Sequence, residues 1–442
     1  MLNMRTNSGV LACLTLPLIA SSQSITPSIS YNGNANTPQM GWDTYNAYGL
    51  DYNETIVRTN AQRLTNLGFR DLGYRVVIFD DAMTERQRAE NGSLVANAEK
   101  FPSGLATLVD ELHSDGLLFG VYSSAGKYTC GKYPGSLGYE KTDADWWSSL
   151  GADYLKYDNC YNEGLSGTPK LSQDRYAVMS NALNTSNSNF TYSLCNWGDD
   201  KPWEWASTIA NSARISGDIY DSFLVPSTSC PCGPDEYYCE LPGYGCSVLN
   251  ILGKASYITS KNQPGYWNDL DMLEVGNGGM TTAEYRTHMT MWAAIKSPLI
   301  MGNKLDQLSV ADYQILTNPA ILALSQDPVG SAAQRRVVKQ VEPKDEYGFG
   351  EVQIWSGQLY GGDYVVIFLN AANDTQDVEV PLWQVFGLIT ATQAEEDWAT
   401  YDLWAENVTI SAGVASMVLN GTMDLSSSST NGTLQATTTP PR

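Results

Sequence analysis

Charged residues stand in this chain at positions where apolar residues are expected. In the stretch GADYLKYDNC, residues 151–160, Lys156 and Asp158 end a run that otherwise has the pattern of a buried strand. Side chains two positions apart lie on one face of a strand, and burying a carboxylate is costly even beside a cation. A structural ion pair is the simplest interpretation. However, other strand-like runs also end in acidic residues, namely Asp80 and Asp81, Asp218, and Asp269 and Asp271.

Such carboxylates could hydrolyse a glycosidic bond, because two of them flanking the bond supply the nucleophile or base and the acid. Aromatic rings that could stack on a sugar stand in or beside the same runs: Trp42, Tyr45, Tyr122, Trp197 and Trp267. A cluster of acidic oxygens could instead bind Ca²⁺ or Mg²⁺. Lys156 and Arg214 are interleaved with the acids and would compete with a metal, so we favour a sugar over a metal ion as the ligand.

The elements that must position these residues alternate between residues 38 and 305. Runs such as YRVVIFDD and LLFGVYSS are separated by stretches such as AEYRTHMTMWAAIK, with apolar residues at three- and four-residue steps. Eight such runs predict parallel βα units, and eight strands close a (β/α)8 TIM barrel with its active site at their C-terminal ends. An open doubly wound sheet is the alternative, but no glycine-rich phosphate turn follows the first run.

The two ends of the chain differ from this pattern. Arg5 and an apolar run from Val10 to Ala20 followed by small residues predict a signal peptide over residues 1–23; a buried first helix is the alternative. We assign residues 24–328 to the barrel and 329–424, where strands lack helices between them, to an antiparallel β-sandwich. The Ser/Thr-rich segment 425–442 is expected to be a disordered tail.

Composition limits the partners of the protein. The formal net charge of −22 argues against nucleic acid, and no stretch beyond the signal peptide is long and apolar enough to span a membrane. We therefore expect a secreted, extracellular protein with a carbohydrate substrate; its oligomeric state is not determined by the sequence. Sequons for N-glycosylation agree with export and begin at Asn53, Asn91, Asn184, Asn189, Asn373, Asn407, Asn420 and Asn431.

The cysteines also suit an oxidising compartment. Cys13 would leave with the signal peptide, and the seven that remain leave one unpaired. Four of them crowd the segment CPCGPDEYYCELPGYGC: Cys230, Cys232, Cys239 and Cys246. A zinc site is possible there, but export and the Pro/Gly content favour two local disulfides.

The ordered motifs MGWDTYN, IFDDAM, KYDNC, LCNWG, RISGD and GYWNDLDMLEVGNGGM resemble glycoside hydrolase family 27, the α-galactosidases and α-N-acetylgalactosaminidases. The resemblance covers residues 31–420 and implies a TIM barrel followed by an antiparallel β-sandwich. It places the nucleophile at Asp158 and the acid/base at Asp218. Other residues that it places at the sugar are Asp80, Asp81, Lys156, Arg214, Asp271 and Tyr122, with Trp42, Tyr45, Asn196 and Trp197 as further candidates.

For the cysteines, the resemblance implies a Cys130–Cys160 disulfide beside the pocket. We expect Cys230–Cys246 and Cys232–Cys239 as the local pair, with Cys195 free. The chain departs from many relatives at Tyr45, where they have Trp, and at Ala82, where they have Cys.

The resemblance implies a retaining glycosidase that releases terminal α-galactose from galacto-oligosaccharides and galactomannans. It implies no metal and no organic cofactor. An α-N-acetylgalactosaminidase is the alternative; a catalytically silent sugar-binding protein is a remoter one. Asn196, or Asp199 or a neighbour, is expected to fill the space around C2 and so to exclude an acetamido group. The mechanism requires a raised pKa at Asp218 and an unraised one at Asp158, which we expect Lys156 to keep ionised.

Overall fold

The structure is a computed structural model that describes residues 11–15, 31–224, 246–344, 350–386, 399–404, 408–410, 417–419 and 433–438. Within these ranges the chain divides into two compact units. One comprises residues 28–277 and 297–310, and the other residues 1–27, 278–296 and 311–442. Each unit is described by itself.

The first unit is built on eight parallel strands in the order β8-β7-β6-β5-β4-β3-β2-β9. The sheet curls on itself, and a parallel bridge between Leu273 and Met301 joins the segment after β8 to β9. The predicted eight-stranded barrel is confirmed. The strands are β2 (Met40–Asp43), β3 (Val76–Phe79), β4 (Leu118–Ser124), β5 (Tyr154–Asp158), β6 (Thr191–Cys195), β7 (Ser212–Arg214), β8 (Trp267–Asp269) and β9 (Leu299–Met301).

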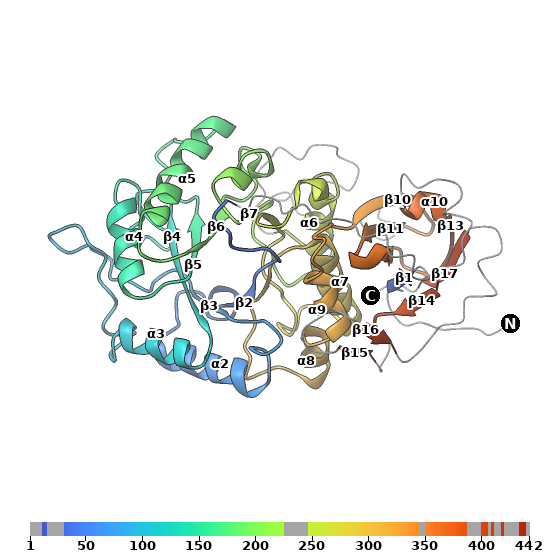
Figure 1. Ribbon diagram of the computed structural model, residues 1–442, viewed down its shortest axis with the longest axis horizontal. Coiled ribbons are helices and arrows are strands. Elements are labelled where there is room, and N and C mark those ends of the chain that lie inside the picture. The colour runs from blue at the N-terminus through green and yellow to red at the C-terminus, as the bar shows by residue number, and fades with distance from the viewer. Residues whose placement is uncertain are drawn as a thin grey trace. The chain divides into compact units, whose positions relative to one another are not determined.

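Helices alternate with these strands, and Figure 1 shows α2 to α5 outside the strands that they connect. Local signals begin them: Asn53 caps α2 by accepting the amide of Ile56, and Thr168 caps α5, which starts with Pro169. The helices of this unit are α1 (Tyr45–Tyr48), α2 (Glu54–Asn66), α3 (Leu105–Ser114), α4 (Glu140–Ser149), α5 (Pro169–Asn184) and α6 (Val248–Ala255).

The register of the barrel brings the polar strand ends together. Ser124 at the end of β4 pairs with Asp158 at the end of β5, and Asp158 pairs with Cys195 at the end of β6. Arg214 at the end of β7 pairs with Asp269 at the end of β8. The carboxyl ends of the parallel strands therefore present their polar residues at one end of the barrel.

The second unit contains antiparallel strands and the helices α7 (Thr282–Ile295), α8 (Val310–Leu316), α9 (Pro319–Ser325) and α10 (Leu382–Phe386). Its main sheet has the order β10-β11-β12-β1-β14, and β13 pairs with β17 and β15 with β16. Val352, Ile354, Val366 and Phe368 of the sheet pack with α10 in a hydrophobic core. The strands are β1 (Leu11–Thr15), β10 (Gln334–Gln340), β11 (Glu351–Gln358), β12 (Tyr364–Asn370), β13 (Gln376–Pro381), β14 (Ala399–Asp402), β15 (Val408–Ile410), β16 (Met417–Leu419) and β17 (Thr433–Thr438).

Two segments at the chain ends differ from what their composition indicates. Residues Leu11–Thr15, inside the predicted signal peptide, form β1 between β12 and β14. Residues Thr433–Thr438, inside the predicted disordered tail, form β17 against β13. For these six residues the expectation of disorder is wrong, because β-branched threonines suit a strand and β13 offers an edge to pair with.

Candidate active site

A pocket lies among the barrel strands, where side chains from seven of the strands or the segments that follow them converge. It encloses about 320 Å³ of space, which includes space open to solvent. Its walls combine a few apolar groups with many charged ones. The lining residues are Asp43, Ile78, Tyr154, Lys156, Ser193, Cys195, Arg214, Asp269, Asp271, Met272 and Ile300.

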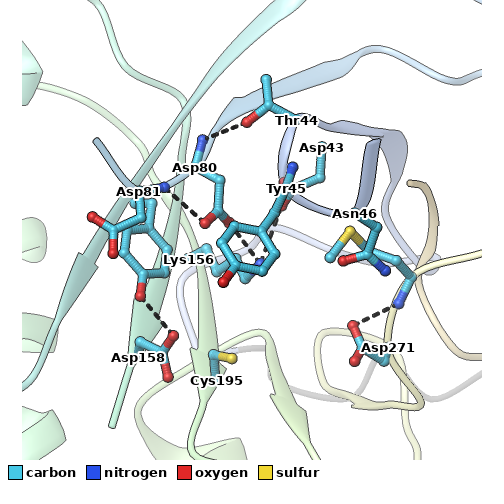
Figure 2. A network of polar contacts seen from close by, with 12 residues as sticks. Asp43, Thr44, Tyr45, Asn46, Asp80, Asp81, Lys156, Asp158, Cys195 and Asp271 are labelled. Atoms are coloured by element: carbon cyan, nitrogen blue, oxygen red, sulfur yellow. Dashed lines mark hydrogen bonds and ion pairs between the residues drawn. The ribbon is translucent and has the colours of Figure 1, made fainter. Parts of the chain in front are cut away.

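Lys156 is held between two carboxylates on one side of this pocket. Its ammonium lies 2.7 Å from Asp80 Oδ2 and 3.2 Å from Asp43 Oδ2 (Figure 2). Both carboxylates are buried, and burial followed by repulsion from Asp80 raises the pKa of Asp43 to about 8. Asp43 also accepts the backbone N–H of Tyr45 at 2.8 Å. Sequence reasoning missed Asp43, although its place at the end of a strand with the other acids is a signal that could have found it.

Arg214 holds two carboxylates on the other side of the barrel. Its Nη2 lies 2.8 Å from Asp218 Oδ1 and 2.8 Å from Asp271 Oδ2. The chain bends at Ser216 and Gly217, so that two residues four positions apart can meet. Arg214 and Asp271 are buried, whereas the Asp218 side chain is 60% exposed.

Asp158 is buried, and it forms its hydrogen bonds with residues other than Lys156. Its Oδ2 accepts the hydroxyl of Tyr122 at 2.7 Å (Figure 2), and its Oδ1 accepts the backbone N–H of Asn159 at 2.7 Å. The sulfur of Cys130, in the Cys130–Cys160 disulfide, lies 3.4 Å from Oδ2. The Lys156 ammonium lowers the pKa of Asp158, as expected, but burial and the Asp218 charge outweigh it, and Lys156 forms its ion pairs with Asp43 and Asp80.

The pKa values of the two candidate catalytic carboxyls are shifted in the opposite sense to the expected one. Burial, followed by repulsion from Asp218, raises the pKa of Asp158 to about 7. Burial acts in the same direction on Asp218, but the Arg214 guanidinium outweighs it and lowers the pKa of Asp218. In the site without substrate, these surroundings therefore favour a proton on Asp158 over one on Asp218.

Asp81 anchors the loop that follows β4. Its Oδ2 accepts the backbone N–H of Gly131 at 2.6 Å, and its Oδ1 accepts that of Ala82 at 2.8 Å. Burial raises the pKa of Asp81 to about 6. Ala82, Trp197 and Asp271 have φ angles of +80°, +58° and +82° although they are not glycines. All three follow barrel strands, and such backbone strain concentrates at functional sites.

Of the predicted aromatic residues, Tyr45 and Tyr122 lie at the site. Tyr45 is 39% exposed, and its ring centroid lies 5.9 Å from the Lys156 ammonium. Trp42 is 0% exposed and donates to the carbonyl of Asn303, so its prediction as a sugar-binding residue is wrong. The reason is strand alternation: Asp43 lines the pocket, and its neighbour Trp42 therefore points to the other face of β2. Trp267 is likewise fully buried.

Alternation also corrects the prediction for β6. Ser193 and Cys195 line the pocket, and Asn196 is 0% exposed, with its amide donating to the carbonyl of Asp199 at 2.7 Å. Asn196 therefore cannot fill the space beside a sugar, and Asp199 is itself bonded to Asn159. Trp197, which is 9% exposed, lies just beyond the strand end. Within the motif LCNWG, residues 194–198, the residue that lines the pocket is Cys195.

The structure contains the Cys130–Cys160 disulfide, and Cys195 is a buried free thiol, whose pKa burial raises. Cys246 is disulfide-bonded. Cys230, Cys232 and Cys239 lie outside the described residues, so the predicted pairs Cys230–Cys246 and Cys232–Cys239 stay predictions.

Comparison with known proteins gives two matching families. Residues 37–225 and 245–327 match a family described as alpha galactosidase A. Residues 349–426 match the alpha galactosidase C-terminal beta sandwich domain.

Individual relatives match over most of their length. An alpha-galactosidase of Lachancea cidri is 46% identical over 406 residues, which are 91% of this chain and 86% of the relative. A solved alpha-galactosidase of Saccharomyces cerevisiae is 45% identical, with a TM-score of 0.84 over 87% of this chain and 85% of that one. A structure of alpha-galactosidase from the same organism with raffinose is 40% identical, with a TM-score of 0.86 over 94% and 98% of the two chains.

Proposed function

Because this chain belongs to the α-galactosidases of glycoside hydrolase family 27, we propose that it releases terminal α-D-galactose with Asp158 as nucleophile and Asp218 as acid and base. The observation that carries these roles is the contrast between the two carboxyls. Asp158 is buried and oriented by Tyr122 and a backbone amide, whereas Asp218 is 60% exposed. A nucleophile needs a fixed position, and an acid/base needs access to the leaving group and to water.

The reaction proceeds in two displacements. A carboxylate oxygen of Asp158 forms a bond to the anomeric carbon while the bond to the leaving oxygen breaks, and Asp218 gives its proton to that oxygen. Asp218 then takes a proton from water, whose oxygen displaces Asp158 and releases galactose with its α configuration. We expect the carboxyl oxygens of the pair to lie about 5–5.5 Å apart, as in retaining enzymes.

Substrate binding must move the shared proton from Asp158 to Asp218. A bound sugar replaces water around Asp218, which raises its pKa, and sugar hydroxyls compete for the Arg214 guanidinium that lowers it. Both effects favour the protonated form of Asp218 and the ionised form of Asp158. The free site therefore carries the one proton that the reaction needs, and substrate binding moves this proton to Asp218.

The remaining charged groups suit a polyhydroxylated ligand. Lys156 and Arg214 donate hydrogen bonds, Asp80, Asp81 and Asp271 accept them, and Tyr45 offers an exposed ring beside Lys156. Lys156 is already paired with Asp80 and Arg214 with Asp271, so a sugar exchanges hydrogen bonds with these groups without leaving a buried charge unpaired.

We propose galactose, rather than its 2-acetamido relative, as the preferred sugar. The relatives support this preference, because proteins 45% and 46% identical to this chain are alpha-galactosidases, and an acetamido group needs added space and polar partners. The ratio of kcat/KM for p-nitrophenyl α-galactoside and the corresponding α-N-acetylgalactosaminide tests it. Equal values or a reversed order would contradict it.

We also propose that the protein is secreted, that residues 1–23 are removed, and that it carries N-linked glycans. Among the described helices none is long and apolar enough to cross a membrane. The sequon residues within the described ranges are exposed: Asn53, Asn91, Asn184, Asn189 and Asn373. N-terminal sequencing of protein from the culture medium tests the cleavage, and a mass decrease after glycosidase treatment tests the glycans.

Hydrolysis of p-nitrophenyl α-galactoside, followed by NMR of the sugar released, tests the activity and mechanism. The first product must be α-galactose. Initial release of the β anomer would overturn the retaining mechanism, and absence of hydrolysis would overturn the activity.

A further inference from the structure

Two exposed tyrosines stand together in the two loops that the Cys130–Cys160 disulfide joins. Tyr128 is 41% exposed and Tyr161 is 43% exposed. Their ring centroids are 5.7 Å apart, with an interplanar angle of 87°. We infer that Tyr128 and Tyr161 form a binding surface for the sugar of the leaving group, an inference that rests on the proposed function and names its substrate class as oligosaccharides.

The disulfide connects this tyrosine pair to the catalytic pocket. Tyr128 is two residues before Cys130, and Tyr161 is one residue after Cys160. Because consecutive Cα atoms are about 3.8 Å apart, the backbone of each tyrosine lies within about 8 Å of a half-cystine. The Cys130 sulfur is 3.4 Å from Asp158 Oδ2. A ligand bonded to the galactose C1 thus starts close to the tyrosine pair.

The loop after β4 approaches the pocket closely at its tip. Gly131 donates its backbone N–H to Asp81 at 2.6 Å, and Tyr128 and Pro134 form an antiparallel bridge at the base of this turn. The loop therefore runs from the tyrosine pair to a carboxylate of the sugar site. A leaving group that extends along the loop passes from the pocket to the rings.

The two loops hold the tyrosine pair in place before any ligand binds. The backbone N–H of Lys127 donates to the carbonyl of Tyr161 at 2.9 Å. At Gly126 the loops are so close that a Cβ would lie 1.9 Å from the carbonyl oxygen of Cys160. Tyr161 itself has a φ of +52°, a strained conformation for a residue with a side chain. A surface ordered in advance costs less entropy on binding.

The chemistry of the pair fits a sugar ring. Exposed tyrosines offer apolar faces for the C–H groups of a pyranose and hydroxyls for its oxygens. The Lys127 ammonium, 5.6 Å from the centroid of the Tyr128 ring, adds N–H donors for further hydroxyls. A sugar ring carries both C–H groups and hydroxyls, whereas a purely apolar leaving group has no hydroxyls.

Two substrates that share galactose but differ in the leaving group test the inference. Raffinose has sugars beyond the galactose, whereas α-galactosyl fluoride has no ring there. For Tyr128→Ala and Tyr161→Ala we expect kcat/KM on raffinose to fall about five- to tenfold, with kcat/KM on the fluoride unchanged. The variants Tyr128→Phe and Tyr161→Phe keep the rings and should retain most of the activity on raffinose.

Tyr360→Ala is the matched control, because this tyrosine is 55% exposed in the other compact unit. This substitution should leave kcat/KM unchanged on both raffinose and the fluoride. Equal losses on raffinose and on the fluoride, or no loss on raffinose, would overturn the inference. Failure of the unaltered enzyme to hydrolyse the fluoride would instead overturn the proposed function.

Discussion

Replacing Lys156 by methionine removes a cation that Asp43 and Asp80 contact at 3.2 and 2.7 Å. The two carboxylate side chains are only 1% and 2% exposed. Breaking a buried ion pair in this way costs about 3–5 kcal/mol. We therefore expect the Lys156→Met variant to lose about that much stability at pH 8.

The loss should change little between pH 8 and pH 5. Burial and Asp80 raise the pKa of Asp43 to about 8 even with Lys156 present, and removing Lys156 raises it further. Below pH 8 the folded unaltered protein and the folded variant therefore both bind a proton at Asp43 that the unfolded chain holds only weakly above pH 4. The free energies of unfolding of both proteins rise together as the pH falls from 8 towards 4, by up to about 1.4 kcal/mol per pH unit, so the difference between them stays nearly constant.

Thermal unfolding at pH 8 and pH 5 measures the effect. At about 2 °C per kcal/mol for a unit of this size, the apparent Tm should fall by about 6–10 °C at both pH 8 and pH 5. Because a hydrogen bond from a charged group contributes about 1.5–3 kcal/mol, kcat/KM on p-nitrophenyl α-galactoside should fall about 10- to 150-fold.

Arg88→Met is the matched control. Arg88 pairs with the buried Asp143 at 2.6 Å, and its side chain is 12% exposed compared with 14% for Lys156. Asp143 is not among the residues that line the pocket. This variant should lower Tm but leave kcat/KM unchanged. The reasoning is refuted if Lys156→Met is as stable as the unaltered protein at pH 8, or if both variants lose activity equally.

Three further predictions concern the catalytic residues and the free thiol. Above about pH 7 the Asp158–Asp218 pair loses its shared proton, so kcat/KM on p-nitrophenyl α-galactoside should fall about tenfold per pH unit. The leaving group of α-galactosyl fluoride needs no proton, so kcat/KM on this substrate should show no such decline. Parallel pH profiles for the two substrates would contradict this assignment. Asp158→Gly should abolish hydrolysis, and added azide should restore cleavage with a β-galactosyl azide product; activity without azide would exclude Asp158 as the nucleophile. Cys195 is buried and its thiol pKa is raised, so Ellman's reagent should react with it only after unfolding; rapid reaction of the native enzyme would show that the thiol is accessible.

Much of the site follows from local pattern in the sequence. Acidic residues at the ends of β-rich runs, with helical periods between the runs, predict a parallel barrel and a polar end to it. Lys156, Arg214 and Asp271 all lie in the pocket as expected, because a strand's carboxyl end can be recognised from the chain alone. The bend after Arg214 that lets it reach Asp218 also follows from their spacing.

Only the tertiary structure decided which partner each charge has and which face each aromatic residue occupies. Trp42 and Asn196 stand beside pocket residues in the sequence, yet both are fully buried, and a difference of one position in a strand reverses the direction of a side chain. Lys156 is two positions from Asp158 but bonds Asp43 and Asp80, which are 113 and 76 positions away. The pKa values of Asp158 and Asp218 follow from these pairings. Burial and charge depend on neighbours brought together by the closing of the barrel, and distance along the chain does not encode them.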